Sequence, residues 1–216
     1  MKIINRYNSK NNIAVTAEII YDIDRLKKEL FPLPNHTETE QFKRIKNKNR
    51  RAEWLSTRYL LKEILGKYPG IEYEYTGRPI LKHKLNLSVT HSKGVVGIVL
   101  SEHDSPGADI EIVNERIQRI AEKFTKPELI IKNRPDNTNR HLYAIWCGKE
   151  TLFKMYAKGN LNFKEHLFID TRQLTEQGVM IARINTDDFT KNYKINYHFF
   201  KHNNTNYIFT YCFNLK

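Results

Sequence analysis

The stretch Tyr193–Phe213 reads YKINYHFFKHNNTNYIFTYCF, and its pattern decides the fold class. Apolar side chains alternate with mostly polar ones on both sides of Asn203-Asn204: Tyr193, Ile195, Tyr197 and Phe199, then Tyr207, Phe209, Tyr211 and Phe213. A period of two is typical of β-strands, and paired asparagines suit the tight turn of a hairpin. The stretch therefore predicts an antiparallel hairpin.

Further strands and helices are expected upstream of this hairpin. Short apolar segments predict strands over 13–20, 71–75, 85–89, 95–100 and 108–113. Helices are expected over 21–30, 37–66, 116–124 and 139–157. The second of these begins at a Thr37/Glu40 capping box and ends at Gly66, and the last ends before Gly159. A second capping box is expected at Thr125 and Glu128. Hairpins outnumber strand-helix-strand units, so an α+β fold is favoured over a doubly wound sheet.

The order of elements repeats along the chain. Helices followed by antiparallel strands occur twice, which predicts two similar halves related by pseudo-twofold symmetry, each with helices packed on a small antiparallel sheet. The predicted boundary gives an N-terminal half over 1–104 and a C-terminal half over 105–216.

Charge and composition restrict the partners and the compartment. Thirty-six Lys and Arg against 24 Asp and Glu give 216 residues a net charge of +12, which predicts a nucleotide, nucleic acid or acidic protein as partner. The basic run over 43–51 is equally explained as a solvated helix face. Two cysteines, Cys147 and Cys212, predict reduced, buried thiols and a cytoplasmic protein. The longest apolar run, Val95–Leu100, is too short to cross a membrane.

Acidic and basic side chains gather in two segments. In a strand, Asp109 and Glu111 point to one face while Ile110 points to the other, and like charges this close favour a bound cation. Trp146, Glu150 and Lys154 form one stripe of the predicted helix. Two simpler interpretations stay open: a solvated edge-strand face for the acids, and a surface Glu150–Lys154 ion pair. A structural hydrogen bond is likewise an alternative for His91.

Three motifs together resemble those of the 4'-phosphopantetheinyl transferases. They are Asn86-Leu87-Ser88-Val89-Thr90-His91-Ser92, Gly107-Ala108-Asp109-Ile110-Glu111, and Trp146-Cys147-Gly148-Lys149-Glu150 with Lys154. The resemblance covers about residues 50–168, and the length is similar to that of the Sfp-type enzymes. It implies a monomer whose two halves form a pseudo-dimer. Thr90 stands where the family usually has Ser, and its hydroxyl can donate the same hydrogen bond.

The resemblance implies an activity and a metal site. Family members transfer the 4'-phosphopantetheine arm of coenzyme A to a serine of an apo carrier protein and release adenosine 3',5'-bisphosphate. Asp109, Glu111 and Glu150 would hold Mg²⁺, with Mn²⁺ as an alternative, since these cations prefer carboxylates together with phosphate oxygens. Glu150 would also be the base for the serine hydroxyl, directly or through water. Lys154 would contact the pyrophosphate, with Lys149 nearby.

The resemblance also implies coenzyme A contacts in the N-terminal half. Thr90 and His91 are expected at a phosphate, and Gly77, Arg78 and Pro79 at the adenine and its ribose phosphate. Arg58 with either Arg50 or Arg51 is expected at the 3'-phosphate, because a guanidinium fork suits a phosphate monoester. The expected protein partner is an acidic acyl or peptidyl carrier of fatty-acid, polyketide or peptide synthesis.

Two rival functions are weaker. A metal-dependent nuclease often places a lysine two residues after its second acid, where this chain has Val113 or Leu152. A nucleic-acid-binding module would interleave its aromatics with basic residues, whereas the aromatics of the hairpin alternate as core positions. We therefore expect neither nucleic acid nor a membrane as partner.

Overall fold

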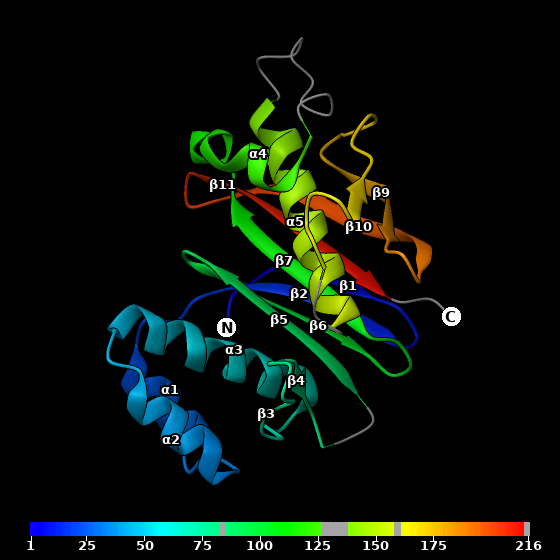
Figure 1. The fold of residues 1–216 in the computed structure, drawn as a ribbon. Helices are drawn as coiled ribbons and strands as arrows, with labels where there is room; N and C mark the ends of the chain where they lie inside the picture. The colour runs from blue at the N-terminus through cyan, green and yellow to red at the C-terminus, as the bar shows by residue number, and fades with distance from the viewer. Residues whose placement is uncertain (83–84, 127–137, 158–160, 214–216) are drawn as a thin grey trace. The chain divides into compact units, whose positions relative to one another are not determined.

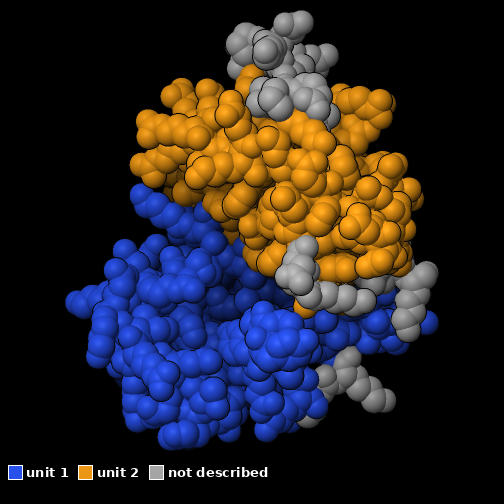
Figure 2. All heavy atoms as spheres, in the orientation of Figure 1, with its two compact units in different colours: residues 1–104 blue, residues 105–216 orange. Residues whose placement is uncertain are grey.

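The computed structural model describes residues 1–82, 85–126, 138–157 and 161–213. The chain folds as two compact units, unit 1 over 1–104 and unit 2 over 105–216, which Figure 2 shows in blue and orange. Each unit has its own antiparallel sheet and its own helices (Figure 1). The predicted α+β class with antiparallel sheets is confirmed.

Unit 1 contains a six-stranded sheet in the order β1-β2-β6-β5-β4-β3. Its strands are β1 Ile3–Asn8, β2 Asn12–Glu18, β3 Glu72–Tyr73, β4 Pro79–Ile80, β5 Asn86–Ser92 and β6 Val95–Ser101, and its helices are α1 Ile23–Leu30, α2 His36–Arg44 and α3 Lys48–Leu65. Apolar side chains of β2, β5 and β6 form a core with Ala52, Leu60 and Leu61 of α3. A second cluster joins α1, α2 and α3.

The long helix expected from Thr37 to Gly66 is wrong, because it is interrupted. Helix α2 begins after Asn35, whose side chain accepts the Glu38 N–H, so the capping box predicted at Thr37 is also wrong. The backbone is extended at Ile45, and Asn47 then caps α3 by accepting the Arg50 N–H. An asparagine side chain that bonds the backbone favours the start of a new helix over continuation of an old one.

Strand β5 runs three residues further than predicted. It ends at Ser92, so Thr90 and His91 lie within the strand and pair with Gly97 and Val96 of β6. A turn follows the strand, and Gly94 in it has φ 85°, a conformation that glycine adopts without strain.

Unit 2 contains a five-stranded sheet in the order β7-β11-β10-β9-β8. Its strands are β7 Pro106–Ile112, β8 Leu167–Ile169, β9 Gln177–Asn185, β10 Thr190–His202 and β11 Thr205–Phe213, and its helices are the 3₁₀ helix η1 Glu115–Ile120, α4 Ala121–Phe124 and α5 Thr138–Tyr156. The helix expected over 116–124 is therefore mostly 3₁₀. Glu128 and Gly159 lie outside the described residues.

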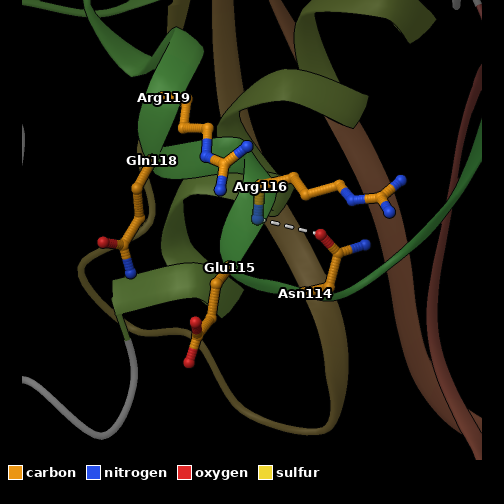
Figure 3. A pocket seen from close by; sticks show the side chains of 5 residues that line it. All are labelled: Asn114, Glu115, Arg116, Gln118 and Arg119. Carbon is orange, nitrogen blue, oxygen red and sulfur yellow. Dashed lines mark hydrogen bonds between the residues drawn. The ribbon is translucent and has the colours of Figure 1, made fainter.

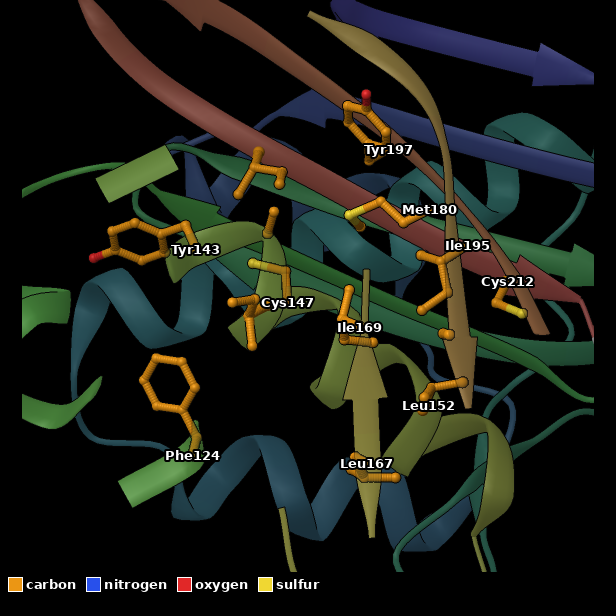
Figure 4. Packing of buried hydrophobic residues seen from close by; sticks show 14 of the residues in the cluster. Phe124, Tyr143, Cys147, Leu152, Leu167, Ile169, Met180, Ile195, Tyr197 and Cys212 are labelled. Atoms are coloured by element: carbon orange, nitrogen blue, oxygen red, sulfur yellow. The ribbon is translucent and has the colours of Figure 1, made fainter. Parts of the chain in front are cut away.

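Helix α5 packs across the unit 2 sheet and lies closest to β7 and β11 (Figure 1). The core under it combines Leu152 and Cys147 of α5 with Ile169, Met180 and Ile195 of the sheet (Figure 4). Cys147 and Cys212 are both free and buried, as predicted. In the described part of the chain, none of the helices is long and apolar enough to cross a membrane.

The predicted hairpin is confirmed as β10 and β11, with Asn203 and Asn204 both at positive φ. Its two aromatic sets lie on opposite faces of the sheet. Phe199 pairs with Ile208, and both belong to the core under α5, whereas Phe200 pairs with Tyr207 and stacks on it with ring centroids 5.3 Å apart.

Candidate active site

Asp109 and Glu111 lie on the face of β7 that α5 covers. Asp109 is the register partner of Thr210, whose hydroxyl bonds Thr151 of α5, and Ile110, between the two acids, points to the other face. Although β7 is an edge strand, Asp109 is only 6% exposed. The interpretation of a solvated edge-strand face is therefore wrong for Asp109.

Helix α5 presents a cation to this strand. The Nζ of Lys154 donates to Asp109 Oδ1 at 2.8 Å and to the Ala108 carbonyl at 3.0 Å. Among the described residues, the carboxylate within ion-pair distance of Lys154 is that of Asp109. The alternative of a surface Glu150–Lys154 pair is thus wrong.

A close approach between β7 and α5 makes this contact possible. A Cβ placed on Gly107 would lie 2.0 Å from the Thr151 carbonyl oxygen, so the backbones meet at a distance that only glycine permits. Next to it, the hydroxyls of Thr151 and Thr210 lie 2.7 Å apart in a buried hydrogen bond. These contacts fix the spacing across which Lys154 reaches Asp109.

The carboxylates of the site act on one another. Burial, followed by the charge of Asp109, raises the pKa of Glu111 to about 7. Burial and the charge of Asp109 also raise the pKa of Glu150 above its usual range, which Lys154 partly offsets. Such a group of acids ionises fully only when additional positive charge is present.

These acids have the donor chemistry that Mg²⁺ prefers. The raised pKa values of Glu111 and Glu150 fit a divalent cation, although within the described residues no three or more His, Cys, Asp or Glu side chains are gathered as a ready-made metal cage. Mg²⁺ commonly takes one or two carboxylates and completes its shell with waters and substrate phosphate. The residues fit that mode of binding.

Lys149, expected near the pyrophosphate, lies in the interior. The residue is 2% exposed, and its ammonium donates to the backbone carbonyls of Phe124 and Phe163. Burial lowers the pKa of Lys149 to about 8. Trp146 packs between the rings of the same two phenylalanines, so Lys149 and Trp146 together hold the segments that flank α5.

Unit 2 also carries a basic cavity that sequence reasoning missed. Figure 3 shows this cavity of about 640 Å³ on η1, lined by Asn114, Glu115, Arg116, Gln118 and Arg119. The Asn114 side chain accepts the Arg116 N–H at 2.9 Å and so caps η1. The signal was the pair of arginines three residues apart, which place two positive charges on one face of a 3₁₀ helix.

In unit 1 Arg50 and Arg51 contact different partners. Arg50 bonds His91 of β5 and lies 3.1 Å from Glu53, so the two predicted phosphate ligands Arg50 and His91 come together. Arg51 instead donates to the Ile45 carbonyl at 2.6 Å and lies over the Phe42 ring.

Arg58 is held in the interior of unit 1. It is 2% exposed, and its Nε donates to Glu38 at 2.7 Å, a carboxylate that is itself 0% exposed. Its guanidinium also lies over the Trp54 ring. This geometry argues against a direct phosphate contact by Arg58. Sequence reasoning missed Glu38, which lies twenty residues away along the chain.

Gly77, Arg78 and Pro79 lie at the β3–β4 hairpin. Gly77 has φ 83° and donates its N–H to the Glu74 carbonyl, which makes the turn, and Pro79 pairs with Tyr73. The Nε of Arg78 is buried and has no hydrogen-bond partner among the described residues. An unsatisfied guanidinium donor is an available anion contact.

Comparisons with known proteins identify a family model and several relatives. A family model described as the 4'-phosphopantetheinyl transferase superfamily matches residues 105–212. Curated proteins named 4'-phosphopantetheinyl transferase AcpT, from Salmonella typhi, Salmonella typhimurium and Escherichia coli, are each 27% identical to this chain in an alignment of 112 residues that covers 49% of the chain. The matched segment spans 58% of the two Salmonella proteins and 57% of the Escherichia coli protein.

Proposed function

The chain belongs to the 4'-phosphopantetheinyl transferase superfamily, and we propose that it transfers the 4'-phosphopantetheine arm of coenzyme A to a serine of an apo carrier protein. The observation that carries the proposal is the group of acids in unit 2. Burial and the charge of Asp109 raise the pKa of both Glu111 and Glu150 beside Lys154, within the segment that the family model matches.

In the proposed reaction the serine oxygen attacks the phosphorus that bears the pantetheine arm. A new P–O bond forms, the bond to the bridging pyrophosphate oxygen breaks, and adenosine 3',5'-bisphosphate leaves. The serine proton passes to Glu150, directly or through a water. A general base must lie within hydrogen-bond reach of the proton that it accepts. Glu150 lies on helix α5 beside the acids of the site, and burial with the charge of Asp109 raises its pKa in the metal-free protein.

The metal ligands proposed for the site are Asp109, Glu111 and Glu150. A bound Mg²⁺ would neutralise the charge that develops on the pyrophosphate. Lys154 would add a fixed positive charge to a pyrophosphate oxygen, because its ammonium is already held beside Asp109. Lys149 would act on the site through the two segments that it anchors.

Unit 1 would supply the nucleotide contacts. Arg50 and His91 are proposed at the 3'-phosphate, with the Thr90 hydroxyl as a further donor, since Arg50 is half-exposed and meets His91. Arg78, between Gly77 and Pro79, is proposed at the adenine and ribose phosphate. Its unpartnered Nε supports that role.

The carrier is proposed to be acidic and to meet positive charge. The chain has a net charge of +12, and Arg116 and Arg119 line the cavity on η1. Electrostatic attraction of this kind acts mainly on the rate of association. We also propose that the enzyme works as a cytoplasmic monomer.

The decisive experiment incubates the protein with coenzyme A, Mg²⁺ and a panel of apo carriers and follows their intact mass. The proposal requires addition of the arm to at least one carrier and its absence when the acceptor serine is replaced by alanine. A panel that stays unmodified while a known family member modifies it would reject the function.

A further inference from the structure

The carboxylate of Glu38 is the centre of a buried polar cluster in unit 1. It accepts hydrogen bonds from Arg58 Nε at 2.7 Å, from the Tyr68 hydroxyl, from the Ile71 N–H at 3.2 Å and from the Asn35 side chain at 3.2 Å. Glu38 is 0% exposed. A buried charge is tolerated only when its hydrogen-bonding capacity is met, and here donors come from α2, α3 and the segment before β3.

The segment held by this carboxylate turns sharply. Gly70 has φ 83°, and a Cβ at this position would lie 3.0 Å from the Asn35 amide nitrogen and 3.5 Å from Glu38 Oε2. The Ile71 N–H is therefore presented to Glu38 by a turn that only glycine adopts without strain. The carboxylate fixes where β3 begins.

The cluster is linked to the β3–β4 hairpin by a series of direct contacts. Arg58 Nη2 lies 3.5 Å from the hydroxyl of Tyr73, and Tyr73 is the register partner of Pro79. One residue further, the Glu74 N–H donates to the Arg78 carbonyl at 2.9 Å. Arg78 thus directly precedes Pro79, the register partner of the tyrosine that Arg58 contacts.

The same cluster is linked to the helix of Arg50. Arg58 lies two turns further along α3, donates to the Trp54 carbonyl at 3.2 Å and packs over the Trp54 ring. We infer that Glu38 and Arg58 are positioning residues that hold the Arg78 hairpin in fixed relation to helix α3. The inference rests on the proposed function, because it assigns to the pair the task of orienting the coenzyme A contacts.

The test uses variants of the full chain that each disturb buried hydrogen bonds. Tyr68→Phe removes a donor to Glu38, and Glu38→Gln removes the charge while keeping the shape. Ser56→Ala is the matched control: Ser56 lies on the same helix and is fully buried, but its hydroxyl bonds the Ile20 backbone instead of the hairpin.

Two readouts separate positioning from a purely structural role. Amide exchange of Glu74, which reports the hairpin bond to Arg78, should become about tenfold faster in Tyr68→Phe and Glu38→Gln and stay within about twofold in Ser56→Ala. The KM for coenzyme A should rise roughly fivefold or more while kcat at saturating coenzyme A stays within about twofold. Simple loss of folded protein would instead lower kcat and leave KM unchanged.

Each outcome decides the inference. Faster exchange with an unchanged KM, or an unchanged exchange rate, would overturn it and leave the proposed function standing. A wild-type chain that does not bind coenzyme A in calorimetry would reject the proposed function and the inference with it. If Glu38→Gln does not fold, Tyr68→Phe alone decides.

Discussion

Lys154 on α5 donates to Asp109 on β7 across 2.8 Å, so residues 45 positions apart form one partly buried ion pair in unit 2. The pair places a cation beside an acid whose charge, together with burial, raises the pKa of both Glu111 and Glu150. A change in metal concentration, a change in pH and the substitution of a charged residue should therefore have different effects on activity and stability.

Asp109→Ala and Glu150→Gln should differ in their response to metal. A weakened metal site is compensated by mass action, so raising Mg²⁺ or Mn²⁺ should partly restore Asp109→Ala. Loss of a proton acceptor is not compensated, and Glu150→Gln should remain roughly 10²–10⁴-fold slower in single-turnover transfer at saturating metal and coenzyme A. Glu176→Gln, at an exposed glutamate, is the control. Full rescue of Glu150→Gln by metal would leave that residue as a ligand only.

Arg50→Ala and Arg78→Ala should weaken coenzyme A more than dephospho-coenzyme A if they contact the 3'-phosphate. A charged hydrogen bond contributes about 1.5–3 kcal/mol, so we expect a roughly ten- to hundredfold rise in dissociation constant by calorimetry. Arg44→Ala, at the exposed end of α2, should leave both ligands unaffected. An equal loss for both ligands would exclude the arginine concerned from the 3'-phosphate.

The metal-free protein should lose stability as the pH rises through neutrality. The pKa of Glu111 is raised from 4.5 to about 7 in the folded state, so its contribution is fully present below pH 4.5 and is lost as the pH rises through 7. The loss is on the order of 2 kcal/mol. Urea unfolding with EDTA at pH 5 and pH 8 measures it. The same slope in Glu111→Gln would assign the effect to another group.

Carrier docking should depend strongly on salt. Exposed charges are screened over about 8 Å at physiological ionic strength, so the KM for the carrier should rise with salt while the KM for coenzyme A changes less. Arg116→Ala with Arg119→Ala should raise the carrier KM and flatten its salt response. Arg172→Ala is the control, since this exposed arginine pairs with Asp170 at a different surface. A salt-independent KM would indicate an apolar interface.

Local patterns predicted local structure well. The alternation around Asn203-Asn204 predicted β10 and β11, and the helix expected over 139–157 is found as α5. The break before α3 was missed because Asn47 stands within a basic run that continues the helical composition on both sides.

The burial of charged side chains was the feature of the structure that the sequence could not predict. The family resemblance implied that Arg58 lies at the 3'-phosphate and Lys149 near the pyrophosphate. Each is instead enclosed by partners far away in sequence: Glu38 for Arg58, and the carbonyls of Phe124 and Phe163 for Lys149. Such pairings depend on tertiary packing and leave no periodic trace in the chain.

The contact at Gly107 has a consequence for how this protein can evolve. Any other amino acid at this position adds a Cβ that would lie 2.0 Å from the Thr151 carbonyl oxygen. Even alanine, the smallest replacement, would therefore require helix α5 to move away from β7. Natural selection at this position therefore either keeps glycine or accepts a displaced helix. Gradual adjustment of the distance between Asp109 and Lys154 must therefore proceed through neighbouring side chains such as Met155, whose Cβ also lies against this glycine.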